Sequence, residues 1–153
     1  MYSFLLFLHS VIRWGVLLSL LYALVRGVRG WTGHRPFTPT DNTIRNTTVT
    51  FSHSQLLVGY TLYFVSPLVA SYRYGASDTV SLPLRFFGWM HPLLMTIVVV
   101  LITIGSSATK RQSTDTAKFR TMTIWFALAL LALICAIPWP FSPLAQRPYL
   151  RLF

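Results

Sequence analysis

The stretch SFLLFLHSVIRWGVLLSLLYALVR, residues 3–26, decides the fold that the sequence predicts. It is long and apolar enough to cross a bilayer, because the hydrocarbon core takes about 20 residues of helix. It differs from a secretory signal since no basic segment precedes the apolar run, and His9 and Arg13 interrupt it. We therefore expect a retained membrane span that carries an imidazole and, four residues later, a guanidinium on the same face.

The composition of the whole chain extends this interpretation to all 153 residues. Hydrophobic residues make up 54% of the chain and charged residues only 10%, whereas a soluble domain usually has about 25% charged residues. The composition thus predicts one integral membrane domain over residues 1–153. The single cysteine, Cys135, excludes an internal disulfide, a cysteine-based zinc site and c-type haem attachment.

Three further apolar segments complete the predicted fold. They cover residues 44–72, 84–106 and 119–137, and the segments that connect them are short. Short connections place successive helices antiparallel. The fold class that we predict is all-α, an integral membrane four-helix up-down bundle.

Local signals refine the second and third of these helices. Asp41 or Asn42 is expected to cap the second helix at its start. Pro67 should bend or end that helix, and Pro92 should bend the third.

The basic residues predict the orientation. The chain has 13 Lys and Arg against 3 Asp and Glu, a net charge of +10. No nucleic-acid-reading motif accompanies this charge, so we assign it to anchoring in the lipid bilayer. The richer end is expected to be cytoplasmic, with both termini periplasmic, in a bacterial inner membrane. That end holds Arg26, Arg29, Arg35, Arg45, Lys110, Arg111, Lys118 and Arg120.

Two histidines are expected at the same depth in the bundle. His9 lies about two turns into the first span, and His91 lies about two turns beyond Arg85 in the third. These spans run in the same direction and are diagonal in an up-down bundle, so the two imidazoles could ligate one haem b from opposite sides. Gly88, one turn before His91, could admit the porphyrin, or could serve helix packing alone.

Arg13 needs a hydrogen-bond partner, and none of the predicted spans contains a carboxylate that could pair with it. Asp41, Asp78 and Asp115, the three acids, all fall in predicted loops. An unpaired guanidinium in hydrocarbon costs several kcal/mol. Its partner is therefore expected to be a backbone carbonyl, water, or an anion such as a haem propionate or lipid phosphate. A quinone carbonyl would also accept its hydrogen bonds.

His53 lies near the opposite end of the second span and has no histidine at its depth. A second haem there would need Met122 or a second copy of the chain in a homodimer. His53 could instead contact a quinone head group together with Gln55 and Tyr60, or simply bond a neighbouring helix. His34 is expected to be a solvated loop residue.

Other functions remain open at this point. His9, His91 and Met95 could handle copper, and a cofactor-free accessory or assembly subunit would use the same residues to hold helices together. The chain shows no nucleophile–base pair and no paired carboxylates, so no catalytic residue is assigned. Whether it is a quinol-linked oxidoreductase is left open.

Four motifs carry a resemblance to a known group. LHSVIRW, FSHSQLLVGYTLYFVSP, HPLLM followed by ITIGSSATKR, and IPWP together resemble small bacterial four-helix membrane proteins of the cytochrome b type. The resemblance covers nearly the whole chain and implies haem at His9, His53 and His91. It implies one-electron transfer, linked to quinone or to a larger respiratory complex. An acidic residue often precedes the third histidine in that group, but Met90 stands there in this chain.

Cytochrome b561 is a more distant analogy. Its pattern uses two histidine pairs for two haems, whereas this chain has three histidines within predicted spans. The analogy therefore implies one haem with two histidine ligands, and a second only if His53 finds another ligand.

Overall fold

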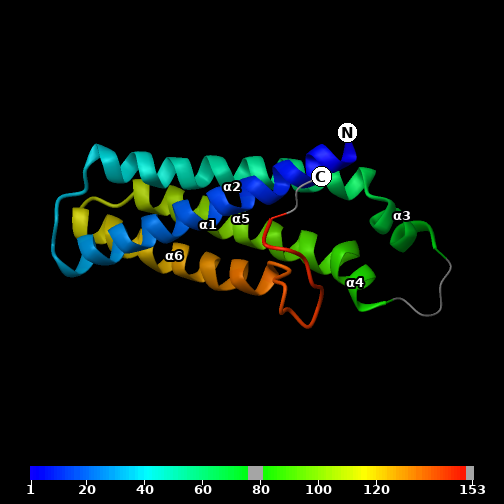
Figure 1. The fold of residues 1–153 in the computed structure, drawn as a ribbon. Coiled ribbons are helices and arrows are strands. Elements are labelled where there is room, and N and C mark those ends of the chain that lie inside the picture. Colours follow the sequence, from blue (N-terminus) through cyan, green and yellow to red (C-terminus); the bar gives the residue numbers. More distant parts are fainter. Residues whose placement is uncertain (76–80, 151–153) are drawn as a thin grey trace.

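The computed structural model describes residues 1–75 and 81–150. Within these ranges the chain is helical and contains no strand, which confirms the all-α prediction. Four long helices lie side by side (Figure 1). They are α1 (Tyr2–Thr32), α2 (Pro39–Val65), α5 (His91–Lys110) and α6 (Asp115–Ala136), and the shorter α3 (Pro67–Tyr74), α4 (Leu82–Arg85) and η1 (Phe86–Met90) connect α2 to α5.

The long helices form a ring. α1 packs on α2 and α6, and α5 packs on the same two helices, so α1 and α5 are diagonal across the centre. The α1–α2 and α5–α6 connections lie at one end of the molecule, while the N-terminus, α3 and α4 lie at the other (Figure 1). We call these the basic end and the terminal end.

Within the described residues, three helical segments are long and apolar enough to cross a membrane. They are Tyr2–Thr32, the continuous run Leu82–Lys110 and Asp115–Ala136. α2 has the necessary length, but residues 42–55 read NTIRNTTVTFSHSQ and lower its hydropathy. α2 ends at Val65, where Ser66 caps the start of α3, so the predicted helix over 44–72 is two helices separated near Pro67.

A capping box starts α2 earlier than the sequence predicted. Thr38 is the N-cap, and its hydroxyl and amide pair with the Asp41 backbone and carboxylate. The expectation that Asp41 or Asn42 is the cap is therefore wrong, because Asp41 occupies the third helical position, from which its side chain reaches back. Arg26 of α1 donates to the same carboxylate at 2.8 Å.

A π-helical turn precedes Pro92. The His91 amide donates to the Phe86 carbonyl, five residues earlier. Pro92 lacks an amide hydrogen, so the regular ladder cannot continue through it. The irregularity that we predicted at Pro92 is thus displaced into the turn before it, a form often found at functional sites.

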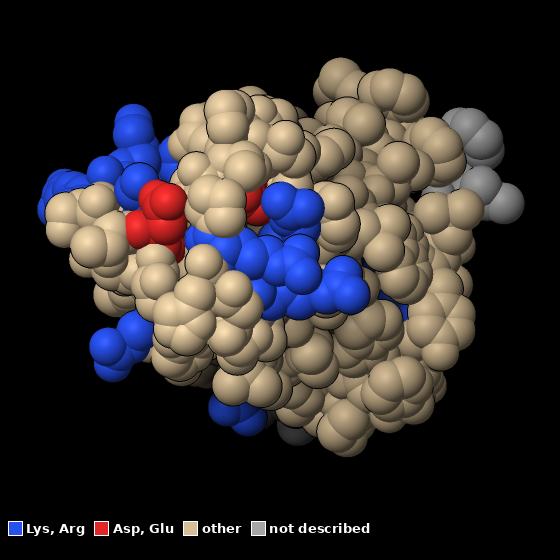
Figure 2. All heavy atoms as spheres, turned by 90° about the vertical axis from the view of Figure 1, so that its left-hand side faces the viewer, with Lys and Arg blue, Asp and Glu red and all other residues tan. Residues whose placement is uncertain are grey.

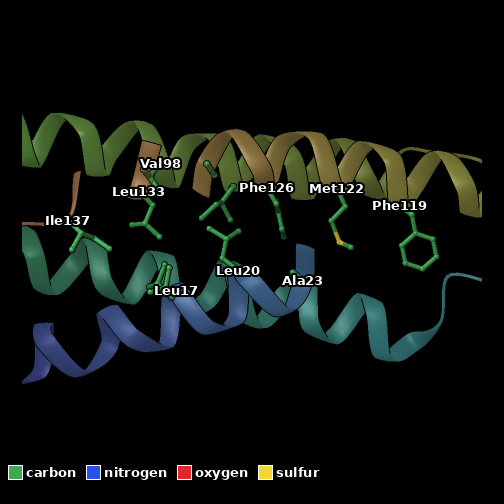
Figure 3. Packing of buried hydrophobic residues seen from close by; sticks show 12 residues of the cluster. Leu17, Leu20, Ala23, Val98, Phe119, Met122, Phe126, Leu133 and Ile137 are labelled. Atoms are coloured by element: carbon green, nitrogen blue, oxygen red, sulfur yellow. The ribbon is translucent and has the colours of Figure 1, made fainter. Parts of the chain in front are cut away.

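The core runs along the bundle, and toward the basic end α1 packs closely on α6. The labelled side chains of α6 point toward α1 along the bundle (Figure 3). A Cβ on Gly27 would lie 2.4 Å from the Thr123 hydroxyl, and one on Gly30 would lie 2.4 Å from the Phe119 ring. The glycines at this end of α1 therefore allow close contact with α6.

Charged residues gather at the same end (Figure 2). Arg45 is buried there, and its guanidinium donates to the Ser106 carbonyl at 3.1 Å and to the Asn42 amide oxygen at 2.7 Å. The eight basic residues assigned to one side by the sequence belong to the ends of the four long helices and their two connections at this end.

The Asp41 contacts predict a pH-dependent stability. Burial would raise the pKa of Asp41, but hydrogen bonds from Thr38 and Arg26 outweigh it and hold the pKa below its ordinary value. A carboxyl with a lowered pKa in the folded state stabilises above its unfolded pKa of about 4, and loses that contribution as the pH falls through the folded value. Asp41→Asn should therefore cost about 1–3 kcal/mol at neutral pH, and the difference should shrink below about pH 4.

Thermal unfolding in detergent across pH measures this. Asp115→Asn is the matched control, because the Asp115 side chain is 45% exposed and pairs with the partly exposed Lys118 at 3.2 Å. Equal losses in the two variants at neutral pH would contradict the assignment.

Candidate functional site

A cavity of about 190 Å³ lies among α1, α2, α5 and the residues that follow α6, toward the terminal end. This is far more than the roughly 10–15 Å³ that one water requires. Its walls are mainly apolar, with His9, Arg13, Gln55, His91 and Arg147 among the polar exceptions. Among the described residues its lining includes no Asp or Glu.

His9 and His91 face each other across this cavity. Their ring centroids are 6.3 Å apart and their planes cross at 66°. They come from the diagonal helices α1 and α5, the latter directly after the π turn. The structure therefore brings together the two histidines that the sequence placed at one depth.

The His91 ring is held by its own contacts. Its Nδ1–H donates to the Ala136 carbonyl at 2.9 Å. The rings of Phe86 and Phe87 lie 5.5 and 5.9 Å from it, centroid to centroid. A bond from Nδ1 to a carbonyl defines the tautomer and leaves Nε2 with a lone pair for a metal or a donor.

The His9 ring sits against a glycine of α2. A Cβ on Gly59 would lie 3.2 Å from His9 Cε1 and 3.7 Å from Nδ1. Gly59 thus makes room for the imidazole and turns its Cε1–Nδ1 edge toward α2. His9 Nδ1 is buried and has no hydrogen-bond partner among the described residues.

Arg13 finds a backbone partner in the segment after α6. Its guanidinium donates to the Tyr149 carbonyl, and the Trp14 indole donates to the same oxygen at 3.0 Å. The Ser10 hydroxyl lies 3.5 Å from the guanidinium. A carbonyl was one of the partners that the sequence left open, and a non-protein anion stays a prediction.

Gly88 lies outside the cavity lining. It is buried in the π turn, where a Cβ would meet the Tyr72 ring of α3 at 2.5 Å. Close packing of η1 on α3 accounts for this glycine, the second of the two roles considered for it.

Tyr60 belongs to the cavity lining, whereas His53 does not. Tyr60 lines the cavity and donates to the Thr96 hydroxyl at 2.9 Å. His53 is exposed on α2, with its Nδ1–H donated to the Val49 carbonyl at 2.8 Å and Thr103 Oγ1 3.5 Å from Nε2. Met122 is fully buried on α6, which is diagonal to α2, so it does not approach His53. His34 is exposed in the connection after α1, as expected.

Sequence reasoning associated Gln55 with His53 rather than with His9, and it missed Arg147 in the cavity lining. Gln55 and Gly59 are four residues apart on one face of α2, a spacing that could have linked them to His9. Arg147 lines the cavity with its guanidinium 4.8 Å from the Phe87 ring centroid. No local pattern pointed to Arg147, because it follows α6 in irregular structure.

No known protein family, curated protein or solved structure matches the chain.

The contacts of Tyr149 predict that the segment after α6 is held over the cavity by α1. Trp14→Phe removes one donor to the Tyr149 carbonyl while keeping an aromatic ring. Losing a hydrogen bond of about 0.5–1.5 kcal/mol should increase opening of this segment up to about tenfold. Cleavage by chymotrypsin near Tyr149, followed by mass spectrometry, measures this. Trp31→Phe, at the basic end of α1, should cleave at the wild-type rate, and an unchanged rate for Trp14→Phe would refute the contact.

Proposed function

We propose that this protein is a membrane b-type cytochrome in which His9 and His91 would hold the iron of one haem. The observation that carries the proposal is the 6.3 Å separation of the two imidazole centroids inside an apolar cavity. Two imidazoles that share one metal ion at about 2 Å from each nitrogen would have ring centres about 6 Å apart. The resemblance of four sequence motifs to small bacterial cytochrome b-type proteins supports the same conclusion.

The residues present fit a haem. His91 already has the Nδ1 contact that leaves Nε2 available. Arg13 and Arg147 line the cavity and could pair with the propionates, while its apolar walls suit the macrocycle. When bound, haem would supply one-electron redox chemistry, and a histidine pair would keep the iron closed to other ligands.

The chain's own residues would hold and shield the group. Arg13 and Trp14 keep the segment after α6 over the cavity. Tyr60 closes its α2–α5 side through Thr96, whose hydroxyl donates in turn to the Pro92 carbonyl at 2.7 Å. These contacts would limit entry of water to the cavity.

The proposal places the bundle in a bacterial inner membrane with four spans. α2 would be the fourth span, with its polar first half near the basic end. The basic end would be cytoplasmic and both termini periplasmic, because Lys and Arg favour the cytoplasmic side.

One haem at the terminal end would not carry an electron across a hydrocarbon core of about 30 Å. We therefore propose one-electron exchange on the periplasmic side, with a quinone or a larger respiratory assembly. A second haem at His53 would need a second copy of the chain, since His53 is exposed on α2.

Reduced-minus-oxidised spectroscopy of the detergent-purified protein tests the proposal. The wild type should show a b-type α-band, and His9→Ala and His91→Ala should each abolish the low-spin spectrum. His53→Ala and His34→Ala are matched controls and should keep it. A colourless, folded wild type, or an unchanged spectrum in either ligand variant, would overturn the proposal.

A cofactor-free accessory subunit is the second candidate, favoured by the protein carbonyls that already pair with Arg13 and His91. A copper-handling protein would use His9, His91 and Met95, which line the same cavity. Metal analysis of the purified protein separates the three functions: haem iron, copper, or neither.

A further inference from the structure

The two histidines of the cavity differ in how their second ring nitrogen is satisfied. His91 donates its Nδ1–H to the carbonyl of Ala136, the last residue of α6. A carbonyl at a helix end has no intrahelical partner and is free to accept. His9 lies inside α1, where the neighbouring carbonyls accept within the helix, and its Nδ1 has no partner among the described residues.

Gln55 lies beside His9 and has the complementary atom. Its Nε2 donates to the His9 carbonyl at 3.0 Å, so the amide is held against α1 at this residue. Its Oε1 is buried and accepts no hydrogen bond from the described residues. Gln55 is also one helical turn from Gly59, which contacts the Nδ1 edge of His9.

No other buried side-chain oxygen without a partner in the described part of the chain lies near enough to accept the Nδ1–H of His9. In the described part of the chain, Thr123 Oγ1 is the remaining side-chain oxygen of this kind. It packs against Gly27 of α1, which is 18 residues from His9 and therefore about 27 Å along the helix.

We propose that Gln55 is the positioning residue of His9: the structure leaves Gln55 Oε1 and His9 Nδ1 unjoined, and a small rotation of the two side chains lets Oε1 accept the Nδ1–H of the imidazole and directs Nε2 toward His91. The expected effect on a haem rests on the proposed function, whereas the Gln55–His9 pairing concerns the protein alone. Metal-binding histidines commonly donate their other ring N–H to such an acceptor, which orients the ring and raises its basicity. Gln55 would do for His9 what the Ala136 carbonyl does for His91.

Substitutions of Gln55 test the pairing in the haem-loaded protein. Gln55→Leu removes the acceptor at similar volume and should weaken haem retention about 10–100-fold. The His9 ligand should also become less basic, which raises the midpoint potential, while Gln55→Glu should lower it. A tenfold difference between the affinities of the two oxidation states corresponds to about 59 mV. Gln112→Leu is the matched control, because Gln112 lies at the basic end and donates only to the Ala108 carbonyl at 3.3 Å.

A second measurement uses the haem-free protein. In ¹⁵N-histidine-labelled wild type, the His9 resonances should show a protonated Nδ1, and Gln55→Leu should shift them while leaving His91 unchanged. If the wild type binds no haem but shows this shift, the proposed function fails and the pairing stands. If the potential and retention of both Gln55 variants equal those of the wild type, or the His9 tautomer does not respond, the inference is overturned. If Gln55→Leu does not fold, Gln55→Glu still tests it, since it preserves the shape of the side chain.

Discussion

The diagonal placement of α1 and α5 is the constraint on which the cavity depends. Because each of these helices packs on α2 and α6, the central space between them is the one place where their side chains meet. Toward the basic end, buried side chains of α6 such as Phe119 and Met122 pack close to Gly27 and Gly30 of α1 and belong to the core. At the terminal end the space stays open, and the two imidazoles share it at 6.3 Å. One packing arrangement thus gives a solid core at one end and a cavity at the other.

The positive charge of Arg13 in the cavity has a hydrogen-bond acceptor, but that acceptor is a neutral carbonyl and not an anion. The Tyr149 carbonyl accepts from Arg13 and from Trp14, so the guanidinium has a hydrogen-bond partner. A carbonyl dipole offsets part of the cost of a half-buried charge, but a carboxylate or phosphate offsets more. Since no Asp or Glu belongs to the described lining, a bound anion would complete the site.

Much of the fold follows from hydropathy and helical spacing, and the rest depends on contacts between distant residues. Apolar runs predict the long helices, and the rise per residue predicts that His9 and His91 share a level. The start of α2 at Thr38 could have been recognised, because TPTD has the spacing of a capping box. The contact of Trp14 with Tyr149 joins residues 135 positions apart, and irregular structure after α6 has no periodicity from which to predict it.

The motif IPWP acquires a second role once the helix ends are considered. Pro138 and Pro140 follow α6 closely and prevent its continuation, which is what the sequence alone indicates. Ending the helix there also leaves the last carbonyls of α6 without intrahelical partners. The Trp139 indole N–H donates to the Ile134 carbonyl at 2.9 Å, and the His91 Nδ1–H donates to the Ala136 carbonyl. Moving the end of α6 by one turn would bury the Ala136 carbonyl in the helix, and His91 would lose the acceptor that defines its tautomer.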